Sequence, residues 1–271
     1  MIKIFVDSGS SIKQEEKERY GVEILPLKIL INDVEYSDGL DITCESFYDL
    51  VKQAHTFPKT SLPSLDEAHE RVMKYVNSDY DVVIITISSQ ISGTFNALKM
   101  LFNEEPKVKV VDSKSAVGGI RILVNEANKH LDKPVEQVVD MLNAIAPKIT
   151  ALAVPETLDN LRKGGRLSAT GWAVGSLLKI KPIIELKNGV AIKGKVIGLK
   201  SAMKFLIKAL NNCNTNYPII PSYTFDDKNL NELLSKTPDN FIKVMGDKDN
   251  LTPAIACHWG ANAFGYVFVE K

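Results

Sequence analysis

The sequence predicts an α/β protein made of two domains. In residues 1–160, short runs of β-branched residues alternate with segments of helical periodicity, which is typical of a parallel sheet covered by helices on both faces. Residues 161–271 instead combine a hairpin signal with less regular strands and helices, which is typical of an α+β domain with a mixed or antiparallel sheet. We place the boundary near residue 160, between Val154 and Gly164.

The N-terminal domain is expected to be a parallel-sheet α/β/α domain. Its strands are short apolar runs, and its helices repeat apolar residues every three to four positions. The expected strands are 2–6, 22–30, 34–36, 82–87, 108–111 and 150–154. The expected helices are 12–20, 46–55, 65–76, 94–102, 120–130 and 135–146. Asn32-Asp33 is a turn signal that predicts a small hairpin, and Ser64 with Glu67 predicts the capped start of a helix.

The C-terminal domain has a different pattern. Asn188-Gly189 separates two apolar runs, and this dipeptide strongly predicts a hairpin. The expected strands are 182–186, 190–193, 218–223, 241–245 and 265–269. The expected helices are 158–163, 201–210 and 230–235.

Composition and charge exclude several classes of protein. The 33 basic residues equal the 33 acidic ones, which argues against a nucleic-acid-binding protein. Cys44, Cys213 and Cys257 form neither a disulfide framework nor a metal motif, which is typical of a reducing cytoplasm. No apolar run reaches the ~20 residues that cross a bilayer, and the chain opens on a strand rather than a signal peptide. We therefore expect a cytoplasmic protein without stable membrane insertion.

The most informative motif is Ser88-Ser89-Gln90-Ile91-Ser92-Gly93-Thr94, between an expected strand and an expected helix. The first turn of a helix has unpaired N–H groups and the positive end of the helix dipole, so hydroxyls placed there favour anion binding. Capping of the helix by Ser92 and Thr94 is the alternative. The motif lacks both the P-loop and the dinucleotide fingerprints, so it does not indicate a nucleotide site.

Two other polar segments follow expected strands of the same sheet. Asp7-Ser8 follows the first strand, and Asp112-Ser113 follows the strand 108–111. Ligands of parallel sheets bind at the carboxyl ends of the strands, so three polar strand ends indicate one site better than a single motif does.

Two further motifs contain glycine or hydroxyl residues that favour ligand binding. Thr60-Ser61-Leu62-Pro63-Ser64 is a hydroxyl-rich loop, which by itself is also a turn followed by a cap. Gly118-Gly119 permits either the close approach of a ligand or close packing of a helix on a strand.

The remaining candidates are charged or titratable. Gly164-Gly165-Arg166 ends a helix, and Arg166 either pairs with an anion or is solvated. His258, between small residues near the last strand, is either a site residue or a structural one. No histidine or cysteine cluster has the spacing of a metal site, and Gly-x-Ser-x-Gly is absent, so neither zinc chemistry nor a hydrolase nucleophile is indicated.

Taken in order along the chain, these motifs resemble the DegV family of bacterial fatty-acid-binding proteins. The segments that carry the resemblance are Ile4-Phe5-Val6-Asp7-Ser8, the Thr60 loop, 87–94, 111–116, Leu158 to Ser168 with its Gly-Gly-Arg, and Ile180-Lys181-Pro182-Ile183. They extend over nearly the whole chain, and the ordered set is much more specific than any one segment.

The resemblance implies a carrier rather than an enzyme. A long-chain fatty acid would lie between the domains, and residues matching Thr60 and Ser92 would hold its carboxylate, with Arg166 and His258 nearby. The remaining expected ligand-binding residues are Ser61, Gly93, Thr94 and Gly118. The carrier would need no cofactor and would present the carboxylate to a separate ATP-dependent fatty acid kinase subunit, which makes acyl phosphate for phospholipid metabolism.

The sequence departs from the family pattern at three places. Leu62 replaces the usual Gln of the Thr60 loop. Ile220-Pro221-Ser222-Tyr223 and the segment 257–262, which includes His258, also differ from the common patterns. The part of the site near the C-terminus is therefore the least determined by the resemblance.

Two other classes of function remain open at the level of sequence. One is an enzyme acting on a small phosphorylated or carboxylated metabolite, with an architecture like dihydroxyacetone kinase, a compact polar pocket and a catalytic His258. The other is an interaction protein without a deep pocket. The shape of the pocket distinguishes these classes from a carrier, which needs a long apolar tunnel with one polar mouth.

Overall fold

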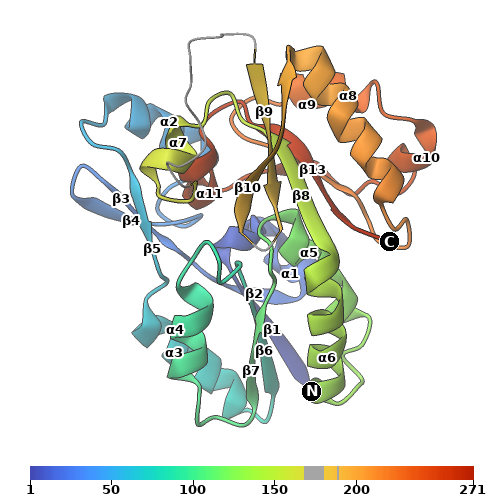
Figure 1. Ribbon diagram of the computed structural model, residues 1–271. Helices are drawn as coiled ribbons and strands as arrows, with labels where there is room; N and C mark the ends of the chain where they lie inside the picture. Colours follow the sequence, from blue (N-terminus) through green and yellow to red (C-terminus); the bar gives the residue numbers. More distant parts are fainter. Residues whose placement is uncertain (168–179, 188) are drawn as a thin grey trace.

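A computed structural model describes residues 1–167, 180–187 and 189–271. Ser168, at the end of the Gly-Gly-Arg motif, and Asn188, in the expected hairpin turn, lie outside the described residues. The described strands form a parallel sheet, a six-stranded mixed sheet and a small antiparallel sheet. The parallel sheet occupies the lower half of Figure 1 and the mixed sheet the upper half.

The parallel sheet has the strand order β2-β1-β6-β7. Its strands are β1 (Ile2–Asp7), β2 (Val22–Leu25), β6 (Asp81–Thr86) and β7 (Val108–Asp112). Helices cover both faces, namely α3 (Leu65–Val76) and α4 (Thr94–Leu101) on one face and α5 (Gly118–Asn128) and α6 (Val135–Ile145) on the other. The expected α/β/α arrangement is confirmed.

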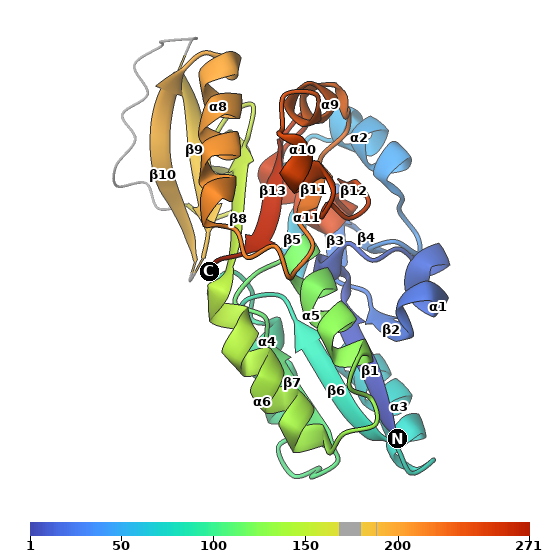
Figure 2. The ribbon, with the colours of Figure 1, turned by 90° about the vertical axis from the view of Figure 1, so that its right-hand side faces the viewer.

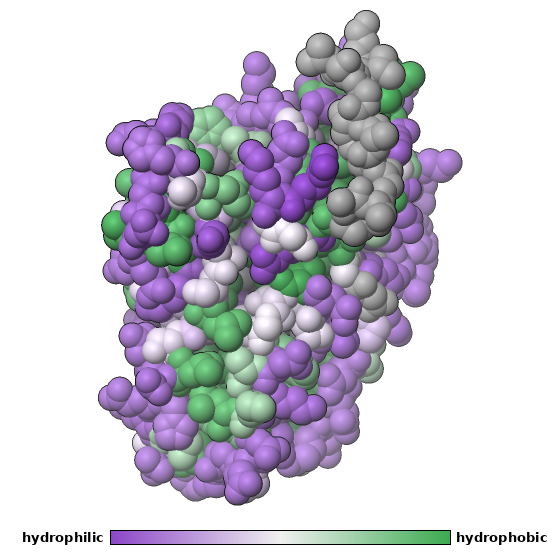
Figure 3. Space-filling view, turned by 60° about the vertical axis from the view of Figure 1, so that its left-hand side comes forward, coloured by the Kyte–Doolittle hydropathy of each residue, from purple (hydrophilic) through white to green (hydrophobic). Residues whose placement is uncertain are grey.

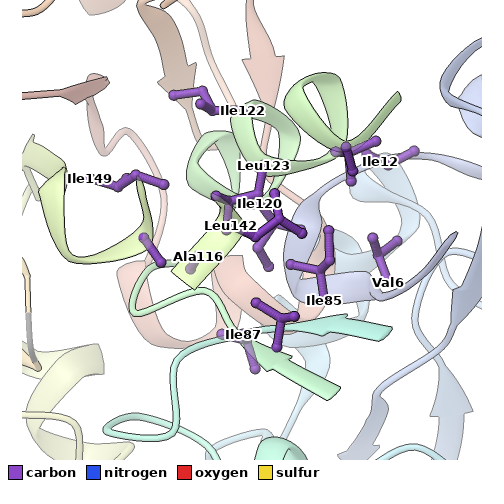
Figure 4. Packing of buried hydrophobic residues seen from close by; sticks show 14 of the residues in the cluster. Val6, Ile12, Ile85, Ile87, Ala116, Ile120, Ile122, Leu123, Leu142 and Ile149 are labelled. Atoms are coloured by element: carbon purple, nitrogen blue, oxygen red, sulfur yellow. The ribbon is translucent and has the colours of Figure 1, made fainter. Parts of the chain in front are cut away.

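The strands of this sheet are apolar because both of their faces are buried. Ile4, Val83 and Ile85 pack under α5 and α6, whereas Phe5 and Ile84 pack under α3 and α4. The alternation follows from the two-residue period of a strand. Figure 4 shows the first of these two clusters, which continues from the parallel sheet through α5.

The mixed sheet has the strand order β10-β9-β8-β13-β11-β12. Its strands are β8 (Ile149–Val154), β9 (Ile180–Leu186), β10 (Val190–Ile197), β11 (Ile220–Tyr223), β12 (Asp249–Asn250) and β13 (Phe264–Val269). Its pairs are antiparallel except for β11 with β12. Helices α8 (Leu199–Ala209), α9 (Lys228–Leu234) and α10 (Asp239–Ile242) pack on its outer face, as Figure 2 shows. The expected α+β domain is confirmed.

The small sheet and three helices complete the fold. Strands β3 (Lys28–Ile31), β4 (Val34–Ser37) and β5 (Lys59–Ser61) pair antiparallel, and β3 and β4 form the expected hairpin. The helices are α2 (Cys44–Gln53), α7 (Asp159–Lys163) and α11 (Pro253–Trp259). Apolar residues of β3, α2 and α11 share one cluster, so this sheet packs against the C-terminal part of the chain.

Strand 150–154 was expected in the parallel sheet, but β8 pairs antiparallel with β9 and β13 of the mixed sheet. Both partner strands, β9 and β13, come later in the sequence. The alternation of strands and helices before residue 150 therefore does not reveal the pairing. A boundary at residue 160 would separate β8 from its own sheet. We therefore propose a boundary at the 3-10 turn Ala146–Lys148, where the chain passes from one sheet to the other.

Three other expected elements differ from the structure in their bounds or in their conformation. The expected strand 241–245 consists of the end of helix α10, a turn and one bridge from Met245 to Ile219. Pro238 and Asp239 favour the helix start just before it. Segment 22–30 is divided at Pro26, which cannot donate to a strand ladder, and its parts join different sheets. The expected helix 12–20 contains a 3-10 turn and the short helix α1 (Lys17–Tyr20).

One face of the molecule combines hydrophobic and hydrophilic residues. On the face shown in Figure 3, hydrophobic and neutral residues gather along the middle, between hydrophilic margins. Within the described ranges, no helix combines the length and the apolar character needed to span a bilayer.

A substitution at Gly118 tests how closely α5 packs on the mixed sheet. A Cβ atom at this position would lie 2.6 Å from Cβ of Ile220, so Gly118→Ala overpacks the contact. We expect the free energy of unfolding, measured by urea denaturation, to fall by about 1–3 kcal/mol. The matched control is Gly93→Ala, whose new Cβ would meet Leu62 at an ordinary 3.5 Å. Equal stabilities of the two variants would contradict this packing.

Candidate functional site

A cavity of about 270 Å³ lies where the carboxyl end of β6, strand β5, the β9–β10 hairpin and helices α7 and α11 meet. Its polar lining residues are Thr60, Ser61, Ser92, Arg166 and His258. Its other lining residues are Leu27, Leu62, Ile87, Ile91, Gly93, Ala116, Leu161, Leu186, Val190, Ala254, Ile255 and Trp259. The polar side chains come from four segments that are far apart in the sequence.

Six of the eight residues expected at the site line this cavity: Thr60, Ser61, Ser92, Gly93, Arg166 and His258. The other two, Thr94 and Gly118, are not among the lining residues. Thr94 is buried and contacts Ser92, whereas Gly118 packs against Ile220 of β11. For Gly118, close packing of a helix on a strand therefore accounts for the glycine.

A hydrogen bond links Thr60 to His258. Thr60 Oγ1 and His258 Nε2 lie 2.8 Å apart, although the residues are 198 positions apart in the chain. Strand β5 holds Thr60 by pairing it with Ile29. Helix α11 begins at Pro253, and the N–H of Ala254 donates to Asp38 Oδ1 at 3.2 Å. This helix presents His258 from the other side.

The imidazole of His258 is held neutral. Burial, and then the positive charge of Arg166, lower the pKa of His258 to about 4. Its Nδ1 is buried and has no hydrogen-bond partner in the described part of the chain. A Cβ at Gly164 would lie 2.3 Å from this nitrogen, so only glycine at position 164 leaves room for the ring.

Arg166 joins two of the sequence motifs. After α7, Gly165 adopts a φ of +72°, which suits glycine and turns the chain so that Arg166 approaches the 88–94 loop. The Arg166 guanidinium donates through Nε to the carbonyl of Ile91 at 3.1 Å and through Nη1 to that of Gly164 at 2.5 Å. It is half-buried, which lowers its pKa from the ordinary value. Arg166 therefore is not a solvated surface residue.

Ser92 lies at the N-terminus of α4. Its hydroxyl lies 2.9 Å from Thr94 Oγ1 and accepts a hydrogen bond from the N–H of Thr94 at 3.3 Å. The cap residue itself, Gly93, contributes no side chain. Ser92 therefore supplies the local capping bond and also lines the cavity, so the two interpretations of this motif are compatible.

Two buried acids fix the loops behind the cavity. Asp7 accepts hydrogen bonds from the N–H groups of Ile87, at 2.7 Å, and Gly9, at 2.8 Å, and so ties the ends of β1 and β6 together. Burial raises the pKa of Asp7 to about 7. Asp112 accepts bonds from the Ser89 N–H and hydroxyl at the end of β7. The three polar strand ends do meet at one edge, and the two carboxylates there have a structural role.

A second, narrower cavity adjoins the first. It measures about 30 Å³ and shares Ala116, Leu186 and Trp259 with the main cavity. Most of the side chains around it are aliphatic or aromatic. Sequence reasoning missed these shared residues, because nothing in their local pattern distinguishes them from other core residues.

The backbone is strained at the junction of the two cavities. Val117 has a φ of +47° and a ψ of −124°, a conformation that β-branched residues rarely adopt. Its N–H donates to the carbonyl of Gly9 at 2.7 Å, which holds the conformation in place. This strained residue lies directly before α5 and lines the narrower cavity.

Comparisons with known proteins agree with this geometry. A family model described as "Uncharacterised protein, DegV family" matches residues 1–271. The chain belongs to the DegV family. It is 30% identical over 277 residues to a protein of Thermotoga maritima named "Fatty acid-binding protein", which covers 98% of this chain and 96% of the relative.

Solved DegV structures share the whole fold. A DegV family protein from Thermus thermophilus, described with fatty acid binding, is 26% identical with a TM-score of 0.86 and coverage of 100% and 99% of the two chains. A stearic-acid-binding protein from Eubacterium ventriosum is 26% identical with a TM-score of 0.85 and the same coverage. DegV relatives are thus described by the ligand that they bind.

The neutral state of His258 gives a pH-dependent prediction. Between pH 6.5 and pH 4, the unfolded chain protonates this imidazole whereas the folded protein does not, so the contribution of His258 to stability falls as pH falls. Lowering the pH from 7 to 4.5 should therefore destabilise the wild type relative to His258→Gln by about 2 kcal/mol in urea denaturation.

The comparison with His258→Gln isolates this one group. The buried carboxyls of Asp7, Asp38 and Asp249 have raised pKa values and contribute with the opposite sign, but they are common to both proteins. Parallel stability curves for wild type and variant over this pH range would contradict a neutral buried His258.

Proposed function

We propose that this protein binds a long-chain fatty acid as a carrier. The observation that supports the proposal best is a cavity with several polar lining residues that adjoins a second, mostly apolar cavity, on a fold whose relatives are described as fatty-acid-binding. The carboxylate would lie at the polar end, near Thr60, Ser92, Arg166 and His258, and the acyl chain would pass Trp259 toward the narrower cavity.

The polar end suits an anionic head group. The hydroxyls of Thr60 and Ser92 can donate to a carboxylate, and the guanidinium of Arg166 supplies a positive charge. The N-terminus of α4 adds the positive end of a helix dipole beside Ser92. A neutral His258 can hydrogen-bond without adding a second charge, so the head group would be held by several moderate contacts.

The apolar extension suits the chain. Burying each methylene gains roughly 0.8 kcal/mol, so a chain of about 15 carbons contributes on the order of 10 kcal/mol before ordering costs. The tail can therefore supply most of the affinity. The narrower cavity of about 30 Å³ has to widen to admit it, and the small side chains of Ala116, Ala151 and Ala153 line the part that would open.

The cavity favours a carrier over the two other classes. Its apolar extension is not needed by an enzyme that acts on a small polar metabolite, and its volume of about 270 Å³ is not expected of a pure interaction protein. We propose that the carboxylate is presented to a separate ATP-dependent kinase subunit in a bacterial cytoplasm. Hydroxyls, a guanidinium and a helix N-terminus can bind an acyl phosphate as well as a carboxylate.

Removing the two hydroxyls tests the head-group assignment. Thr60→Ala combined with Ser92→Ala deletes two hydrogen-bond donors, so affinity for octadecanoic acid should fall roughly 10- to 30-fold in a titration. Native mass spectrometry of freshly expressed wild type should show a co-purified fatty acid.

The matched control is Ser78→Ala, which removes an exposed hydroxyl at the end of α3 and should bind as the wild type does. Unchanged affinity in the double variant would remove Thr60 and Ser92 from the head-group site. No co-purified acid, together with no thermal shift on adding one, would contradict fatty acid binding itself.

The kinase partnership has its own test. A bacterial fatty acid kinase subunit supplied with ATP and a fatty acid should form acyl phosphate much faster when this protein is present than when it is omitted. The expected dependence arises because the apolar cavity holds the tail while the head group stays near the surface. Equal rates with and without the protein would contradict the presentation of the carboxylate to a kinase.

A further inference from the structure

One hydroxyl in the narrower cavity has no partner. Ser222, on β11, is only 7% exposed, and its Oγ is buried without a hydrogen bond to any described residue. It lines the cavity of about 30 Å³ whose other side chains are small, aliphatic or aromatic. The one phenol among them, Tyr266, bonds to Thr237 at 2.6 Å. Ser222 therefore presents an unsatisfied polar group in apolar surroundings.

The strand register explains why there is space beside Ser222. In the mixed sheet, Gly265 of β13 pairs with Ser222 on one side and with Ala153 of β8 on the other. These three small residues form a row across neighbouring strands, and all three line the narrower cavity. Ile220, two residues before Ser222, packs against Gly118, so this face of β11 is the one toward α5.

A buried hydroxyl without a partner is unfavourable, so its surroundings favour a ligand that supplies one. Buried waters in proteins typically make about three hydrogen bonds, and Ser222 is the one unpaired hydroxyl among the described side chains of this cavity. A water beside Ser222 would therefore find no second unpaired hydroxyl among the described side chains that line this cavity. An unsubstituted saturated acyl chain has no atom that can hydrogen-bond to Ser222. An oxygen atom on the chain could form this hydrogen bond.

We propose that Ser222 selects fatty acids that carry a hydroxyl group on the acyl chain. The inference rests on the proposed function, in which the acyl chain passes from the cavity at Thr60 and Ser92 into the adjoining cavity at Ser222. The ligand hydroxyl lies far from the carboxylate, beyond Trp259, and exchanges a hydrogen bond with Ser222 Oγ. Ser222 is thus a specificity-determining residue on β11.

The test compares hydroxylated and plain acids on matched variants. Wild type, Ser222→Ala, Ser222→Cys and Ser235→Ala are titrated with octadecanoic acid, with its monohydroxy derivatives at successive chain positions, and with a cis-monounsaturated acid of the same length. Ser235 is an exposed serine on the outer side of the mixed sheet, so its variant is the control.

The measured quantity is the ratio of the affinity for a hydroxy acid to the affinity for octadecanoic acid. When the hydroxyl is at one or two adjacent chain positions, this ratio should be roughly tenfold higher for the wild type than for Ser222→Ala. Ser222→Cys keeps a side chain of similar size and should lose most of the same preference. Ser235→Ala should retain it. Octadecanoic acid itself should bind to Ser222→Ala at least as tightly as to the wild type.

Two results would overturn the proposal while leaving fatty acid binding intact. The first is an unchanged preference in Ser222→Ala at every hydroxyl position. The second is a gain in affinity for the unsaturated acid that equals the gain for the hydroxy acid and is lost in Ser222→Ala. This result would show that Ser222 recognises a double bond instead of a hydroxyl. A wild type that binds none of these acids would overturn the proposed function together with this inference.

Discussion

The burial of α5 between the two main sheets is the constraint on which the site depends. Its apolar residues share one cluster with strands of both sheets, and Gly118 lets its first turn approach Ile220. Its one buried cation, Arg121, lies 3.1 Å from carboxylates of both Glu16 and Asp249, so the charge is compensated at each side. Because α5 fixes the sheets relative to each other, it also fixes the gap in which the cavities lie.

The main cavity shows how separate motifs acquire one role. Thr60, Ser92, Arg166 and His258 come from a strand end, a loop, a helix C-terminus and a helix, and each has its own local reason for its position. The described contacts that join them are few, namely a hydrogen bond between Thr60 and His258 and one donated by Arg166 to the Ile91 carbonyl of the Ser92 loop. In the proposed function, this polar end would hold a head group, while the apolar walls behind it would supply binding energy.

The glycines and acids near the mouth have structural roles that local patterns could only partly indicate. Gly164 could be predicted as a helix end, but its contact with the His258 ring required the fold. Asp7 could be predicted at a strand end, yet its hydrogen bonds bind backbone N–H groups rather than a ligand. A buried carboxylate at the carboxyl end of a strand is therefore no direct sign of a ligand site.

The sequence by itself determined the two-domain α/β plan and most helices and strands. Of the eight residues that it placed at the site, six line the main cavity. Periodicity and turn residues are local, so they could be read directly. The tertiary structure alone decided the antiparallel pairing of β8, the helix at 239–242 and the apolar extension beside Ala116, Trp259 and Ser222. These depend on which distant surfaces pack together, and burial between sheets is a property of the whole fold that no local pattern contains.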